Sequence, residues 1–108
     1  MKRMARFSFL LPSKFNNGRR VPAKLFRKIQ DTLAKSFQGV TFQKNPQFKG
    51  LWLSQTQKKM ILDDLMVYYV WTEHINEGRA YFQKYKEELK RLFKQEELYI
   101  IEETIEVI

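Results

Sequence analysis

Apolar residues follow two different periods along this chain. Residues Ala5 to Leu11 alternate with a period of two, which predicts a half-buried strand that ends at Pro12. From Pro22 to Phe37 the apolar residues recur every three or four positions, which predicts an amphipathic helix. Gly39 follows, where a left-handed residue commonly caps a helix. The first third of the chain is therefore predicted to be a strand followed by a helix.

Two more strands are predicted after this helix. The second strand begins at Val40 to Lys44, is interrupted at Asn45–Pro46, and resumes over Gly50 to Leu53 as a bulged or bent continuation. A polar turn over Ser54 to Lys59 leads to the third strand, Met60 to Trp71. Its second half is rich in β-branched and aromatic residues, which makes it the clearest strand of the chain.

A second amphipathic helix is predicted from Asn76, with apolar positions that step mostly by three or four residues between Phe82 and Phe93. A last strand over Leu98 to Ile108 completes the order βαββαβ. In this order two helices cover one face of a four-stranded antiparallel sheet, with the spatial strand order four-one-three-two. We therefore predict an α+β, ferredoxin-like fold, formed by residues 1–108 as one domain.

Three of the predicted strands carry apolar residues at neighbouring positions. Leu10, Tyr69 and Ile101 each directly follow another large apolar residue. Successive strand residues point to opposite faces, so this sheet is apolar on both faces, and two helices can cover only one of them. We therefore predict a homo-oligomer that associates through the sheet.

Charge is distributed unevenly along the chain. Residues 1–60 carry 14 Lys/Arg against one acid, a balance of +13, while residues 61–108 carry 6 against 11, a balance of −5. Such polarity steers a protein toward polyanions or acidic protein partners, or toward self-association between opposite patches. The alternative is that the net charge of +8 serves solubility alone.

The basic residues gather before and on the first helix. Asn16, Asn17 and Gly18 are typical turn residues, and this turn leads into a helix amino terminus, where backbone N–H groups favour anions. The turn matches neither the GxxxxGK[ST] phosphate loop nor the Gly- and Arg-containing loop of acylphosphatases. A solvated turn is the alternative interpretation. The candidate residues for binding an anion or nucleic acid are Lys14, Arg19, Arg20, Lys24, Arg27 and Lys28.

Strand aromatics offer a second route to nucleic acid. Phe7, Phe9, Tyr68 and Tyr69 lie on strands one and three, where a related RNA-binding topology places the aromatics that stack on bases. The K/R-G-F/Y-G/A-F-V-x-F/Y pattern of those proteins is missing from the third strand. Packing in the core or against a second copy is the alternative.

The sequence contains no recognisable catalytic or metal-binding set. It has no cysteine, and His74 is its only histidine, predicted to be a surface residue between the third strand and the second helix. Asp63 and Asp64 are adjacent, so they would not converge on Mg²⁺ from a strand, and we predict a solvated hairpin bend there. An acidic edge, either solvated or binding a cation or basic partner, comprises Glu96, Glu97, Glu102 and Glu103. We predict no cofactor, no metal and no catalytic residue.

Neither apolar run suggests a targeting or membrane segment. Phe7 to Leu11 is shorter than the apolar region of a signal peptide, and Leu65 to Trp71 is far shorter than the roughly 20 residues that a membrane span needs. We therefore predict a soluble, cytoplasmic protein that makes no contact with membranes.

Four segments of the chain form a recognisable combination: FLLPSKFNNGRRVPAKLF at the first strand and its turn, SFQGVT after the first helix, GLW in the middle, and FKQEELYI before the last strand. With these segments nearly the whole chain resembles an uncharacterised family of short bacterial ferredoxin-like proteins. The resemblance implies the fold and implies no activity.

These observations predict a non-enzymatic, self-associating binding or structural module. One alternative is nucleic-acid or polyanion binding through the basic loop and the first helix. Another is a small-ligand enzyme of the dimeric ferredoxin-like kind, with Trp52, Trp71 or His74 near a pocket between sheet and helices.

Overall fold

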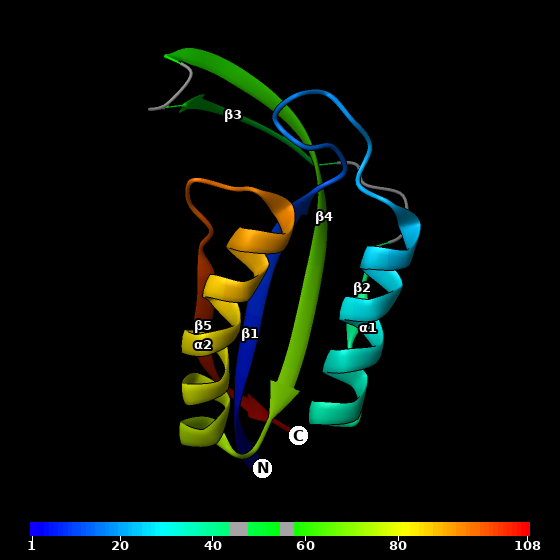
Figure 1. Cartoon of the computed structure of the whole chain (residues 1–108). Helices are drawn as coiled ribbons and strands as arrows, with labels where there is room; N and C mark the ends of the chain where they lie inside the picture. The colour runs from blue at the N-terminus through cyan, green and yellow to red at the C-terminus, as the bar shows by residue number, and fades with distance from the viewer. Residues whose placement is uncertain (44–47, 55–57) are drawn as a thin grey trace.

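The computed structural model describes residues 1–43, 48–54 and 58–108, and it confirms the predicted ferredoxin-like α+β fold. The elements, shown in Figure 1, are β1 (Lys2–Pro12), α1 (Ala23–Phe37), β2 (Thr41–Phe42), β3 (Phe48–Ser54), β4 (Lys59–Thr72), α2 (Ile75–Phe93) and β5 (Ile100–Val107). Since β2 and β3 are the two parts of the predicted second strand, the order is βαββαβ. The predicted interruption at Asn45–Pro46 and residues 55–57 of the predicted turn lie outside the described residues.

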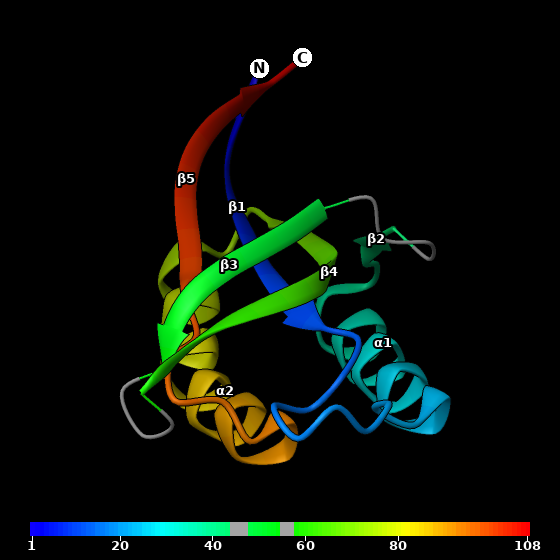
Figure 2. The ribbon, with the colours of Figure 1, turned by 90° about the horizontal axis from the view of Figure 1, so that it is seen from above.

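The sheet is antiparallel throughout and has the strand order β2-β4-β1-β5, as predicted. β2 pairs with β4 at Tyr68 and Tyr69, while β3 pairs with the first half of β4, from Lys59 to Leu65. Both therefore lie along the same edge of β4, opposite β1. At the far end of the sheet Lys2 pairs with Val107, which places the two chain termini side by side (Figure 2).

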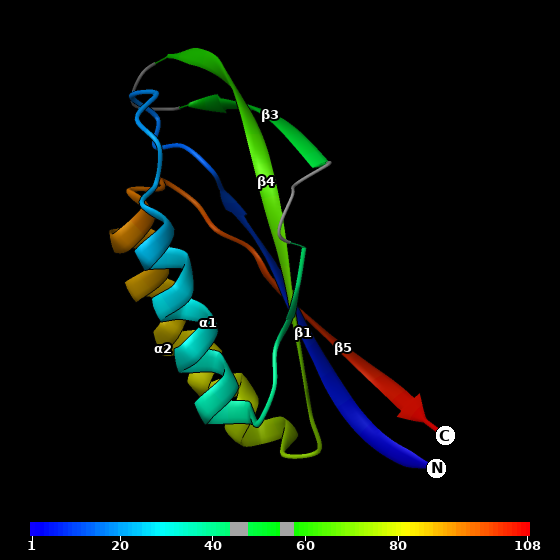
Figure 3. The same ribbon diagram turned by 90° about the vertical axis from the view of Figure 1, so that its right-hand side faces the viewer.

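Both helices cover the same face of the sheet, and the opposite face has no helix over it (Figure 3). α1 buries Phe26, Ile29 and Leu33 against the sheet because these residues recur at helical spacing on one side. The strands contribute alternate residues to the same core: Ala5, Phe7, Phe9 and Leu11 from β1, and Met66, Tyr68 and Val70 from β4. Within the described part of the chain, no helix is long and apolar enough to cross a membrane.

Aromatic rings make up the centre of this core. Phe9 stacks on Tyr68 with ring centroids 5.5 Å apart, and Phe7 lies 4.8 Å from Phe82 of α2. Gln30 of α1 donates a hydrogen bond of 3.4 Å to the Tyr68 hydroxyl, and burial raises the pKa of that hydroxyl. Three of the four aromatics considered for stacking on bases are therefore core residues beneath the helices, which agrees with the interpretation that they pack in the core. Only Tyr69 points to the other face.

Two local predictions are corrected by the backbone. The left-handed residue at the end of α1 is Gln38, with φ of 64°, and not the following Gly39. β4 runs without a break through Asp63 and Asp64, so the predicted hairpin bend is wrong. Pairing of these two aspartates with Gly50 and Lys49 of β3 holds the backbone extended at this point.

Gly78 of α2 lies in close contact with the sheet. A Cβ atom there would lie 2.7 Å from Cε2 of Phe7 and 3.1 Å from Cγ2 of Thr72. Both neighbours are buried, so neither has free space into which to move. The absence of a side chain at position 78 therefore lets α2 pack directly on β1.

Gly78→Ala is expected to destabilise the protein by about 1–3 kcal/mol, because the added methyl group overpacks the core. Gly39→Ala is the matched control, since a Cβ there meets nothing within 4 Å; we expect its stability to be unchanged or up to ~1 kcal/mol higher. Urea unfolding of the two variants measures the difference. Equal stabilities would show that α2 can move away from Phe7 without cost.

Candidate functional site

The helix-free face of the sheet, called the open face below, is apolar at its centre. In an antiparallel sheet, residues paired across strands point to the same side. Leu10 pairs with Val67, and Ser8 pairs with Tyr69 on one side and Ile101 on the other, so these five side chains share the open face. Leu10 and Ile101 remain 42% and 48% exposed, respectively. The prediction of a sheet that is apolar on both faces is therefore correct.

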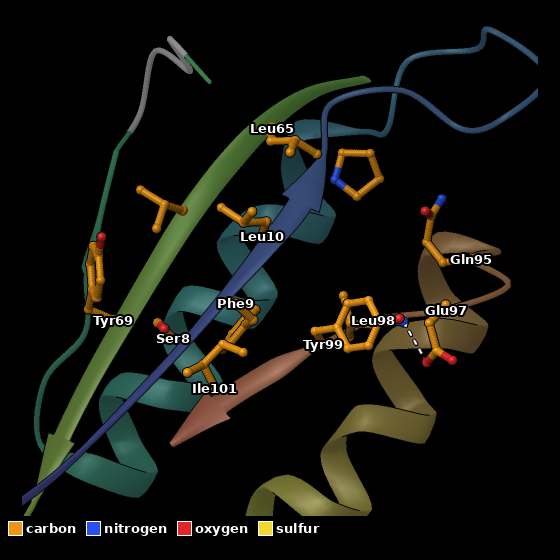
Figure 4. A pocket seen from close by; sticks show the side chains of 12 residues that line it. Ser8, Phe9, Leu10, Leu65, Tyr69, Gln95, Glu97, Leu98, Tyr99 and Ile101 are labelled. Carbon is orange, nitrogen blue, oxygen red and sulfur yellow. Dashed lines mark hydrogen bonds between the residues drawn. The ribbon is translucent and has the colours of Figure 1, made fainter. Parts of the chain in front are cut away.

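An open groove of about 670 Å³ lies on this face. Figure 4 shows Leu10 and Ile101 between the rings of Tyr69 on one side and Tyr99 on the other. Tyr99 is 72% exposed although it is a large aromatic side chain. The residues that line the groove are Ser8, Phe9, Leu10, Pro12, Leu65, Val67, Tyr69, Gln95, Glu97, Leu98, Tyr99 and Ile101.

The carboxylate at the rim of the groove is already bonded within the chain. Glu97 accepts a hydrogen bond of 3.0 Å from the backbone N–H of Leu98, drawn in Figure 4, and lies 3.7 Å from the ammonium group of Lys86. The Leu98 N–H, with a smaller contribution from Lys86, holds the pKa of Glu97 below its usual value. The groove therefore presents apolar surface with a rim that is already neutralised.

Arg6 and Glu103, two charged residues described on the open face, compensate each other in the same way. Arg6 pairs with Glu103 across β1 and β5, at 2.5 Å between Nη2 and Oε2. Its guanidinium carbon also lies 5.5 Å from the centre of the Tyr69 ring, and that ring stacks on Trp71 at 5.7 Å. A partner that covers this face would meet a neutral ion pair and aromatic rings, and no uncompensated charge among these residues.

The edge strand β5 is held to α2 by a bidentate ion pair. Arg79 donates from Nε and Nη2 to the two carboxylate oxygens of Glu102, at 2.7 and 2.6 Å. This contact lowers the pKa of Glu102, mainly through the hydrogen bond, and the ion pair adds to it. The predicted acidic edge thus includes three carboxylates, of Glu97, Glu102 and Glu103, whose charge is met within the chain.

The basic loop before α1 is a tight turn, as its residues predict. The backbone N–H of Phe15 donates to the carbonyl of Arg19 at 2.8 Å, and Val21 donates to Ser13 at 3.0 Å. Gly18 has φ of 88°, which favours glycine. Asn17 accepts a hydrogen bond of 3.0 Å from the N–H of Arg19. These bonds fix the course of the loop at the end of the sheet.

All six predicted basic residues are exposed, and the fold places them on this loop and on the adjoining α1. Two further cations extend this group. Lys35 is exposed on α1, and the ammonium group of Lys94, at the end of α2, lies 5.1 Å from the ring centre of Phe15 in the loop. This contact could not be predicted from the sequence, because Lys94 and the loop are far apart along the chain. Together these eight residues form the basic surface: Lys14, Arg19, Arg20, Lys24, Arg27, Lys28, Lys35 and Lys94.

None of these eight cations forms an ion pair with any carboxylate that the structure describes. Acids of the second half pair elsewhere, with cations of β1 and α2. The carboxylates in these pairs are Glu73, Glu87, Glu88, Glu97, Glu102, Glu103 and Glu106. The uneven charge of the sequence therefore becomes an uncompensated basic surface in the fold.

The residues considered for catalysis do not converge on the groove. His74 lies at the cap position before α2 and is exposed, as predicted. Neither His74 nor Trp71 lines the groove. The side chain of Trp52 is outside the part of the chain whose side chains are described. Among the described residues, no three His, Cys, Asp or Glu side chains gather in a way that could hold a metal ion.

Comparison with known proteins identifies the fold alone. No protein-family model matches the chain, and no curated protein matches it. Among solved structures, the divalent cation tolerance protein CutA1 from Thermus thermophilus is similar, with a TM-score of 0.58 and 17% sequence identity. The match covers 94% of this chain and 84% of that protein. The chain is thus a small protein with a ferredoxin-like fold.

Arg79→Gln is expected to raise the pKa of Glu102 toward its ordinary value, because the variant removes both hydrogen bonds and the positive charge. The folded pKa lies below the unfolded one, so the stabilisation is present at neutral pH and is lost as pH falls through the folded pKa. NMR titration of the Glu102 carboxyl carbon measures the shift. Arg91→Gln, which removes the partner of Glu88, is the control and should leave Glu102 unchanged. An unshifted Glu102 in the Arg79 variant would contradict the assignment.

Proposed function

We propose that the chain, as one domain over residues 1–108, is a non-enzymatic module that self-associates through its open face. The observation that carries the proposal is the apolar groove between Tyr69 and Tyr99, with Leu10 and Ile101 exposed on its floor. Contiguous exposed apolar surface of this kind is typical of protein contact sites. Its removal from water favours association by roughly 25 cal/mol for each Å² that becomes buried.

The arrangement of charge favours a second copy as the partner. The chain has a net charge of +8, so any contact between copies must keep like charges apart. The cations of α1 lie on the helix side, and the open face carries the compensated pair of Arg6 and Glu103. Two copies that meet through their open faces keep both basic surfaces on the outside. Such a contact is self-complementary, as in a two-fold symmetric dimer.

The open-face variant Leu10→Gln/Ile101→Gln is expected to be monomeric, because it replaces the exposed apolar floor of the groove by polar groups without changing the net charge. The native protein is expected to have twice the 13.1 kDa chain mass at micromolar concentration. Light scattering coupled to gel filtration measures both masses. The control Ile108→Gln replaces a fully exposed isoleucine outside the groove and should stay dimeric.

A native protein that is monomeric at these concentrations would refute the proposal. An open-face variant that keeps the native mass would also refute it, since the contact would then lie elsewhere. Both variants change exposed side chains, so they should unfold within about 1 kcal/mol of the native protein, and urea unfolding checks this.

A second candidate function is the binding of a polyanion, including nucleic acid, at the basic surface. The eight exposed cations of the basic surface lie on adjoining elements and have no described carboxylate partner. Acids of the second half of the chain are paired with other cations. Counter-charge for this surface must then come from solution or from a partner. Release of the small counter-ions favours binding of a polyanion.

The basic-surface variant Lys24→Ala/Lys28→Ala is expected to elute from a heparin column at clearly lower salt than the native protein, because two uncompensated charges are lost. Alanine favours helix, and the two lysines repel each other at this spacing, so α1 should remain stable. The matched control is Lys2→Ala/Arg3→Ala, which loses the same charge from residues that are paired with Glu73 and Glu106. Equal elution of the two variants would show that net charge alone governs retention.

A further inference from the structure

The basic surface has the shape of a row, which limits the polyanions that fit it. Lys24, Lys28 and Lys35 lie at positions i, i+4 and i+11 of α1, so they follow one side of the helix over about 16 Å. Asp31, at position i+7, is exposed on the same side of the helix between Lys28 and Lys35, so this row holds three cations and one acid. The loop precedes the amino terminus of α1, and Lys94 contacts the loop at Phe15 from the end of α2. Net positive charge that extends along a helix and the adjoining loop suits a partner that presents many anions over the same length, as a nucleic-acid backbone does.

The surface lacks what a single-stranded nucleic acid or a membrane would require. Binding of single strands relies on exposed aromatics that stack on bases, and membrane attachment of a basic helix relies on apolar side chains that enter the lipid. The ring of Phe15, which contacts Lys94, is partly buried. The apolar side chains of α1 are turned into the core. Among the described residues the large exposed apolar side chains are Met1, Leu10, Tyr99, Ile101 and Ile108, none of which belongs to the loop or to α1.

The α1 cations of the basic surface lie on the helix side of the sheet, opposite the open face, while the loop and Lys94 adjoin Pro12 and Gln95 at one end of the groove. Both helices are on one side of the sheet in Figure 3, and the open-face side chains that line the groove point to the other side. When two copies join through their open faces, their basic surfaces point away from each other. One straight duplex cannot reach both surfaces at once, because the two sheets lie between them.

We infer that the basic surface binds the backbone of double-stranded nucleic acid, and that the self-associated protein holds two duplexes together. This inference rests on the self-association and on the polyanion binding proposed above. Phosphate contacts carry no sequence information, so binding is independent of sequence. Its affinity falls steeply with salt, by a slope of about 0.9 in log K against log salt for each phosphate that is neutralised.

The experiment compares binding with bridging, using short mixed-sequence duplex DNA as the probe. Fluorescence anisotropy over a range of salt concentrations measures binding of one labelled duplex. Capture of that labelled duplex on beads that carry a second, biotinylated duplex measures bridging. Single-stranded DNA of the same sequence and vesicles containing anionic lipid are tested in parallel.

The native protein is expected to bind the duplex and to capture it on the beads. The open-face variant is expected to keep its anisotropy change and to lose at least tenfold in capture, because a monomer has one basic surface. The basic-surface variant is expected to bind more weakly, with a salt slope smaller by about 2. The control Lys2→Ala/Arg3→Ala should behave as the native protein does.

Each negative outcome contradicts a different part of the proposal. A native protein that binds duplex as a dimer without capturing a second one overturns the bridging arrangement and leaves the self-association intact. A native protein that is monomeric by light scattering and still bridges overturns the self-association and the proposed route to bridging. Tighter binding to single strands or to vesicles than to the duplex overturns the choice of partner. A basic-surface variant that matches the control overturns the site.

Discussion

Two helices can cover only one face of a four-stranded sheet, and the other features of this protein follow from that constraint. The chain uses both helices on one face, where α2 packs against β1 at Gly78 and the rings of Phe7, Phe9, Phe82 and Tyr68 fill the core. The strands nevertheless carry large apolar residues at the alternate positions as well. These side chains have no second layer of helices to cover them, so an apolar groove remains on the open face. Surface of this kind is stabilised when a partner covers it.

Charge follows the same division into two sides. Several cations near the open face and on α2 are paired with carboxylates of the second half of the chain, as in the contacts of Arg6 with Glu103 and of Arg79 with Glu102. Pairing of this kind lowers the cost of removing the open face from water, because no net charge is buried with it. The cations of the loop and of α1 have no such partner among the described residues and face outward on the other side. The two sides are thus suited to partners of different chemistry.

Several details could not be read from sequence because they depend on contacts between distant segments. Asp63 and Asp64 have the composition of a bend, but pairing with β3 holds them in an extended strand. Lys94 joins the basic loop only because the end of α2 packs beside Phe15. The residue with positive φ at the end of α1 is Gln38, where a glycine one position later was expected. At Asp63 and Asp64, tertiary pairing outweighed a local preference of modest energy.

The sequence by itself determined the order of elements, the presence of apolar residues on both faces of the sheet and the concentration of cations in the first half. These properties depend on the period of apolar residues and on composition, which are local and additive along the chain. Only the tertiary structure decided which of the two sets of alternate side chains in each strand faces the helices. Tyr68 is therefore buried, while Tyr69 borders the groove. It also decided which cations meet a carboxylate and which do not. Both outcomes depend on strand register and helix packing, which bring together residues far apart in sequence and are therefore invisible to any local pattern.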